Sequence, residues 1–102
     1  MITRNMEDIA NLAMYSGPQL NELIKEAQRS ENEFKLEHIC NGGLKLSVKS
    51  QEAYNVKIID CYIYDSEEKL IKHSIDINGK NKVIFDKYNE LRKIIIKNKG
   101  IA

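Results

Sequence analysis

Tyr-Asn-Val-Lys-Ile-Ile-Asp-Cys-Tyr-Ile-Tyr, residues 54–64, is the stretch that decides the fold, because its apolar side chains change from even to odd positions part-way along. Successive side chains of a β-strand point to opposite faces, so this segment either carries a β-bulge or is apolar on both faces. The regular alternation of the neighbouring strands favours a bulge near Ile58 and Ile59. Such a bulge would leave Tyr62 and Tyr64 on the exposed face, where we expect them to bind a partner protein.

Alternating apolar residues predict further strands on both sides of this segment. Residues 33–40 and 44–50 alternate with a period of two, and Asn41-Gly42-Gly43 between them predicts a tight hairpin turn. Residues 70–77 also alternate, and Asn78-Gly79 predicts the turn that ends this strand. The side chains that share one face of this strand are Ile71, His73, Ile75 and Ile77. Because the connections are short, the four strands are expected to form an antiparallel meander.

Helical spacing of apolar residues marks both ends of the chain. Two short N-terminal helices are expected around residues 9–13 and 20–27, with the break Ser16-Gly17-Pro18 between them. Near the C-terminus, apolar residues recur at i, i+4, i+7 and i+11, which predicts an amphipathic helix. These residues are Ile84, Tyr88, Leu91 and Ile95. Ile94 and Ile96 flank this stripe, and we expect them to offer apolar surface to a partner.

The predicted fold class is α+β, with two short N-terminal helices, a four-stranded antiparallel meander and a C-terminal amphipathic helix. At 102 residues the chain has the size of a single domain, spanning residues 1–102. It shows neither the apolar stretch of a secretory signal nor the roughly 18 consecutive apolar residues of a membrane helix. We therefore expect a cytoplasmic protein whose two cysteines, Cys40 and Cys61, are reduced.

Charge is distributed unevenly along the chain, although the net charge is only +1. Residues 79–102 contain seven Lys and Arg against two Asp and Glu, a local net charge of +5. A basic surface of this kind either keeps a helix soluble or attracts an anionic partner. Nucleic-acid binding is therefore an alternative function, with lysine and arginine side chains of the C-terminal helix as the contacts. They are Lys87, Arg92, Lys93, Lys97 and Lys99.

The N-terminal segment gives a second reason to consider nucleic acid. Ile9, Ala10, Ala13 and Gly17, followed by Leu23, have a spacing that resembles the helix-turn-helix of many repressors. The resemblance covers residues 9–27 only. Pro18 departs from the pattern, and the helix that would read DNA carries Glu22 and Glu26, which phosphates would repel.

Four side chains form the only set that resembles metal ligands: His38, Cys40, Cys61 and His73. A two-Cys, two-His zinc site would be possible if the strands brought them together, and Cys61 with His73 could also form a nucleophile and base. The close ligand pairs typical of zinc sites are lacking, as are phosphate-binding and hydrolase motifs. We therefore expect no catalytic residue, no metal and no cofactor, and we predict that the protein is not an enzyme.

A non-enzymatic interaction or regulatory module is the function that these observations favour. It would act through protein–protein contact, either by self-association, most simply as a homodimer, or by capping a partner protein. The chain resembles accessory proteins of phages and mobile elements in its small size and its richness in Lys, Asn and Ile. The expected contact residues are Tyr62, Tyr64, Ile94 and Ile96.

Overall fold

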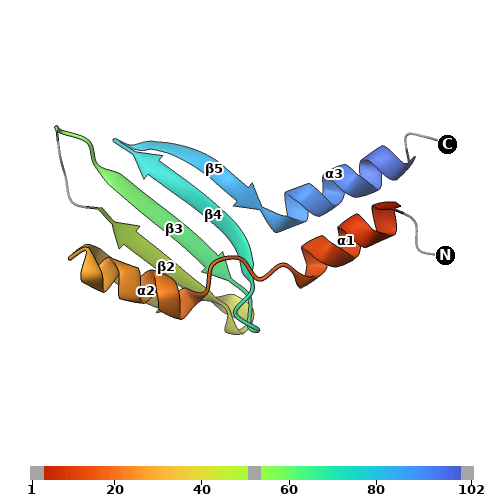
Figure 1. Ribbon diagram of the computed structural model, residues 1–102. Coiled ribbons are helices and arrows are strands. Elements are labelled where there is room, and N and C mark those ends of the chain that lie inside the picture. The colour runs from red at the N-terminus through yellow and green to blue at the C-terminus, as the bar shows by residue number, and fades with distance from the viewer. Residues whose placement is uncertain (1–3, 51–53, 100–102) are drawn as a thin grey trace.

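The computed structural model describes residues 4–50 and 54–99 and confirms the α+β class. The helices are α1 (Arg4–Met14), α2 (Leu20–Arg29) and α3 (Lys87–Lys99), with a single 3-10 turn, η1 (Cys40–Gly42). The strands are β1 (Glu33–His38), β2 (Leu44–Lys49), β3 (Ile58–Tyr64), β4 (Leu70–Ile77) and β5 (Lys80–Asp86). They form one antiparallel sheet in chain order, β1-β2-β3-β4-β5 (Figure 1).

The sheet has five strands, so the prediction of four is wrong, and the C-terminal helix begins later than its periodicity indicated. Asn78 and Gly79 both have positive φ angles, 51° and 86°, and turn the chain back so that β5 pairs with β4. The helix begins at Lys87, after Asp86, whose carboxylate accepts a hydrogen bond from the backbone N–H of Asn89 at 3.1 Å. Ile84 therefore belongs to a strand and not to the helical stripe.

The expected bulge at Ile58 and Ile59 is also wrong. β3 pairs with β4 in a continuous register through these residues, as far as Ile63 opposite Lys72. β3 is instead apolar on both faces, with Ile58 and Tyr62 on one face and Ile59, Cys61 and Ile63 on the other. Shifts of register occur elsewhere, between Ile63 and Tyr64 on β3 and between His73 and Ser74 on β4.

The core lies between α2 and the sheet, and Tyr64 is at its centre. Tyr64 and Leu46 are fully buried and pack with Leu20 of α2 and Leu70 of β4. The Tyr64 hydroxyl donates a hydrogen bond to the backbone carbonyl of Pro18 at 2.7 Å. The predicted exposure of Tyr64 is therefore wrong: the even positions of β3 face α2, because they lie beside the apolar face of β2.

The molecule is elongated because α1 and α3 project together from one end of the sheet (Figure 1). Its radius of gyration is 16.4 Å, against about 13 Å for a compact domain of 100 residues. α1 lies beside α3, whereas α2 lies against the sheet at the other end of the molecule. The two N-terminal helices therefore do not pack as a helix-turn-helix, although the sequence of residues 9–27 resembles that motif.

Replacing Gly17 with alanine is expected to destabilise the protein more than the same change at Gly79. Both glycines have positive φ, 69° and 86°, which costs alanine about 1–2 kcal/mol. A Cβ at Gly17 would also lie 2.7 Å from the Leu70 Cβ, whereas Gly79 is surrounded by open space. Urea unfolding should show at least about 1 kcal/mol of additional loss for Gly17→Ala. Equal losses for the two variants would contradict this packing.

Replacing Tyr64 with phenylalanine should lower the free energy of unfolding by about 1 kcal/mol at neutral pH, because one hydrogen bond is lost while the ring stays buried. Burial raises the pKa of Tyr64 from 10.0 to about 12. The wild type should therefore lose stability as pH rises from 10 towards 12, since the unfolded chain releases this proton first. Urea unfolding at several pH values should show a smaller loss for Tyr64→Phe. Tyr54→Phe, at a fully exposed ring, should behave like the wild type.

Candidate functional site

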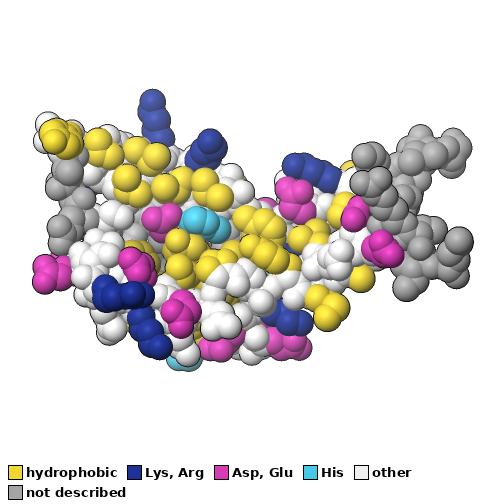
Figure 2. All heavy atoms as spheres, viewed as in Figure 1, with side chains coloured by type: hydrophobic (Ala, Val, Ile, Leu, Met, Phe, Trp, Pro, Cys, Tyr) yellow, Lys and Arg dark blue, Asp and Glu magenta, His cyan; other side chains and the backbone are white. Residues whose placement is uncertain are grey.

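α2 covers part of one face of the sheet, which we call the α2 side, and leaves the rest of that face open. α2 packs over β1, Leu46 of β2 and the Tyr64 end of β3. The remaining side chains of β3 and β4 that point to this side pair across the strands in three rows. We call them the open sheet face: Ile58 with Ile77, Asp60 with Ile75, and Tyr62 with His73. Figure 2 shows hydrophobic side chains surrounding a histidine in this region.

A histidine–aspartate pair lies within this apolar surface. His73 Nε2 and an Asp60 carboxylate oxygen are 2.9 Å apart, and the two side chains are only 19% and 21% exposed. The Tyr62 ring stacks on the imidazole, with ring centroids 4.2 Å apart and an interplanar angle of 16°. The carboxylate and the phenol ring together fix the orientation of the imidazole. Because Nε2 contacts Asp60, Nδ1 is the ring nitrogen left to form a hydrogen bond with a partner.

Burial and the neighbouring Asp60 keep Tyr62 as a neutral phenol. Burial raises the pKa of Tyr62 above its ordinary value of 10.0, and the negative charge of Asp60 raises it further. The open sheet face therefore carries one aromatic pair and one hydrogen-bonded polar pair among isoleucines. Such a surface can pack against another protein with a defined orientation.

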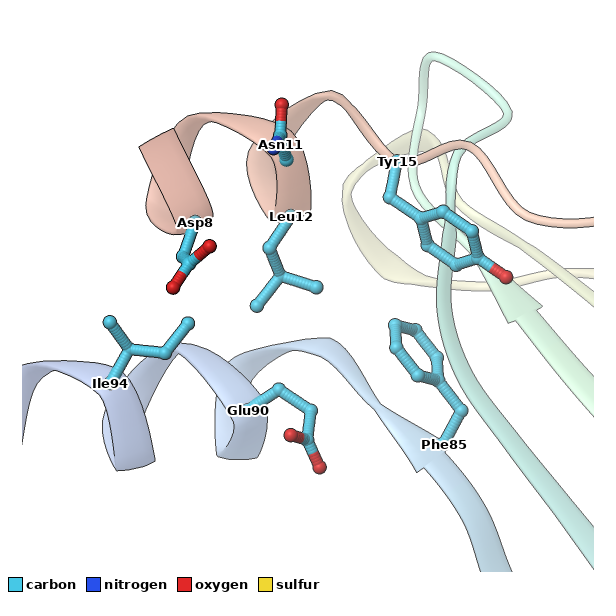
Figure 3. A pocket seen from close by; sticks show the side chains of 7 residues that line it. All are labelled: Asp8, Asn11, Leu12, Tyr15, Phe85, Glu90 and Ile94. Carbon is cyan, nitrogen blue, oxygen red and sulfur yellow. The ribbon is translucent and has the colours of Figure 1, made fainter. Parts of the chain in front are cut away.

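The open sheet face continues into a groove between α1 and α3. The Tyr15 ring meets Phe85, next to the row of Tyr62 and His73, edge to face with centroids 5.3 Å apart. Beyond these rings, Leu12 and Ile94 point towards one another from the two helices (Figure 3). The groove has a volume of about 470 Å³, and its other lining residues are Asp8, Asn11 and Glu90.

The structure separates the residues that were expected to bind a protein partner. Tyr62 is half-buried on the open sheet face, and Ile94 lines the groove. Ile96 lies on α3, with its side chain 60% exposed. Tyr64 is enclosed in the core and cannot contact a partner.

The residues expected for nucleic-acid binding do not form one continuous set. Lys87 is buried at 5% exposure, and its ammonium group donates to the carbonyl oxygens of Ala13 at 3.3 Å and Tyr15 at 3.0 Å, so it is unavailable to phosphate. Arg92 and Lys93 are exposed, and Lys93 pairs with Glu90 at 3.5 Å. The side chains of Lys97 and Lys99 lie outside the described residues.

The possible metal ligands do not converge. Cys61 pairs with Ser74 on the opposite face of the sheet from His73, which excludes both the zinc arrangement and the Cys61–His73 dyad. Cys40 is exposed in η1, and His38 lies on β1. Within residues 4–50 and 54–99, His, Cys, Asp and Glu form no group of three or more that could hold a metal ion.

Sequence reasoning missed the His73–Asp60 pair and the exposure of Ile77. The shared face of His73, Ile75 and Ile77 was visible in the alternation, but periodicity does not show which part of a sheet face a helix covers. That depends on where each helix lies, and in the structure α2 packs on the sheet whereas α1 and α3 project from its end.

Comparisons of the chain with protein-family models, curated proteins and solved structures found no match. In the part of the chain that the structure describes, no helix is sufficiently long and apolar to span a membrane.

Replacing Asp60 with asparagine should lower the pKa of Tyr62. The change removes a negative charge that opposes the phenolate, but burial remains the larger cause, so the pKa should stay above 10.0. NMR titration of ring-labelled tyrosine, with Tyr62 assigned from Tyr62→Phe, measures the shift. Asp76→Asn removes the same charge from the opposite face of the sheet, opposite Ile59, and should leave Tyr62 unchanged. A pKa that does not respond to Asp60→Asn would refute the proposed electrostatic contact.

Proposed function

We propose that this protein is a small non-enzymatic interaction module that acts through protein–protein contact at the open sheet face. The observation that carries the proposal is a half-covered sheet on which three isoleucines lie beside the stacked Tyr62 and His73. A sheet face of this composition is normally buried against another layer. Contiguous exposed apolar surface on a small protein is typical of an interaction site.

The composition of the open sheet face supports a specific contact. Tyrosine is enriched among the residues that contribute most of the binding free energy of an interface, and Tyr62 supplies one in the row of the open sheet face that adjoins the core. His73 and Asp60 already satisfy one another, so burying them beneath a partner leaves few unpaired polar groups. A partner that also forms a hydrogen bond with the free imidazole nitrogen would be preferred over one that only covers the isoleucines.

The border of this surface suggests the chemistry of the partner. Lys80 and Lys82 on β5 lie opposite Ile77 and Ile75, so they point to the same side as the open sheet face. A complementary protein surface would be apolar at its centre and acidic at that edge. Capping of a partner protein in the cytoplasm, in the manner of a phage or mobile-element accessory protein, fits this surface and forms part of the proposal.

Nucleic-acid binding by α3 is the second candidate function. It is favoured by the exposure of Arg92 and Lys93 and by the local charge of residues 79–102. The burial of Lys87 reduces the basic surface available for it. Binding of this kind would weaken strongly with salt, whereas contact at an apolar face would not.

Replacing Ile77 with glutamate should abolish binding of the partner while the fold is retained. Ile77 is 41% exposed on the open sheet face, and Ile59, 37% exposed on the opposite face, provides a matched control. Wild type, Ile77→Glu and Ile59→Glu would be immobilised and incubated with a nuclease-treated extract of the cells that produce the protein. A protein retained by the wild type and Ile59→Glu should be reduced at least tenfold with Ile77→Glu, because the glutamate replaces apolar contact and offsets the positive charge of the neighbouring Lys80, which the acidic edge of the partner needs.

Two results would contradict the proposal. Equal retention by all three proteins would show that the open sheet face is not the binding surface. Capture that occurs only in a parallel extract without nuclease, and is lost at moderate salt for all three, would support the alternative function of α3. Circular dichroism and thermal unfolding establish that each variant is folded.

A further inference from the structure

β1 is an edge strand whose backbone pairs on one side only. It pairs with β2 and with no other strand of the sheet. Successive residues of an antiparallel strand point their N–H and C=O groups alternately to one side and the other. The Ile39 N–H donates to the Gly43 carbonyl at 3.0 Å, so the odd positions of β1 bond to β2. The backbone groups of Phe34, Leu36 and His38 therefore point outward from the sheet.

The two edges of the sheet differ in how readily another strand could pair with them. β5, at the other edge, has a shift of register against β4, and such an irregularity interrupts strand pairing. It also carries Lys80 and Lys82, which are typical of protected edges. β1 pairs with β2 without any shift over Glu33–His38. β1 is therefore the edge that is suited to accept a further strand.

The side chains of β1 suit an antiparallel copy of the same strand. Phe34 and Leu36 lie on the α2 side, opposite Val48 and Leu46 of β2, yet remain 38% and 43% exposed. Lys35 and Glu37 lie on the other face, with Lys35 Nζ 3.8 Å from a Glu37 carboxylate oxygen. A strand with opposite charges two residues apart can pair with an inverted copy so that each lysine meets a glutamate.

We propose that β1 pairs with β1 of a second copy across a twofold axis at Leu36, which joins the two sheets into one. Leu36 then lies opposite Leu36 of the second copy, and Phe34 lies opposite His38 of the second copy. This alignment uses every outward N–H and C=O group of the strand. On the other face it places Lys35 opposite Glu37 of the second copy, with Cα atoms about 4.5 Å apart.

The charges and the backbone disfavour the neighbouring registers. A twofold axis at Lys35 would place this lysine opposite itself, and an axis at Glu37 would do the same for the glutamate. An axis at Phe34 would need the Asn32 N–H, which already donates to the Ala27 carbonyl at 2.8 Å. Because the other edge of the sheet is protected, pairing at β1 produces a closed dimer and not a fibre.

This inference goes beyond the proposed function because it uses an edge of the sheet and not the open sheet face on β3 and β4. Ile77→Glu should therefore leave the dimer intact. Loss of partner capture with normal dimerisation counts against the open sheet face alone, whereas a monomeric wild type that still captures its partner counts against pairing at β1 alone.

A charge exchange followed by sedimentation velocity tests the register. The wild type should dimerise between about 1 and 100 µM. Lys35→Glu and Glu37→Lys should each raise the dissociation constant roughly tenfold, because each places like charges opposite one another at two symmetric positions. Combining them should restore the constant to within about threefold, since opposite charges meet again. Weakening that adds in the double variant would overturn the proposal.

Proline substitution tests the backbone pairing. Leu36→Pro removes an outward N–H but no hydrogen bond to β2, so the sheet should be retained while the dissociation constant rises at least tenfold. Asn81→Pro makes the same change at an outward position of β5 and should leave dimerisation unchanged. A monomeric wild type, or equal weakening by both proline variants, would overturn the proposal. The charge variants leave the backbone unaltered and remain decisive should Leu36→Pro fail to fold.

Discussion

The hydrogen bond from the buried Tyr64 hydroxyl to the Pro18 carbonyl fixes the segment between α1 and α2, and the arrangement of the other elements depends on it. Ser16 accepts a second hydrogen bond, from the Leu70 backbone N–H at 2.9 Å, and Gly17 passes so close to Leu70 that a side chain would not fit. The segment is therefore held across the ends of β3 and β4. α2 leaves it over the sheet, and α1 leaves it in the opposite direction, towards α3 (Figure 1).

This division of the helices leaves two surfaces uncovered, the open sheet face and the groove between α1 and α3. Strands are about 4.8 Å apart, so a five-stranded sheet is roughly 19 Å wide, whereas a helix with its side chains is about 10 Å across. α2 alone can cover about half of one face, and the open sheet face is the other half. Because α1 is directed away from the sheet, α3, which packs against α1, also projects beyond the end of the sheet. Both surfaces thus result from a single anchored segment.

The fold class was predictable because it depends on periodicity, which is local in sequence. The hairpin at Asn41-Gly42-Gly43 and the turn at Asn78-Gly79 were recognisable from residues that tolerate positive φ. The fifth strand was not, because Ile84 is in phase with the helical stripe that follows it. Only pairing with β4 decides its conformation. The face of Tyr64 was predicted wrongly for a related reason: which face of β3 meets α2 depends on contacts with Pro18 and Leu20, remote in sequence.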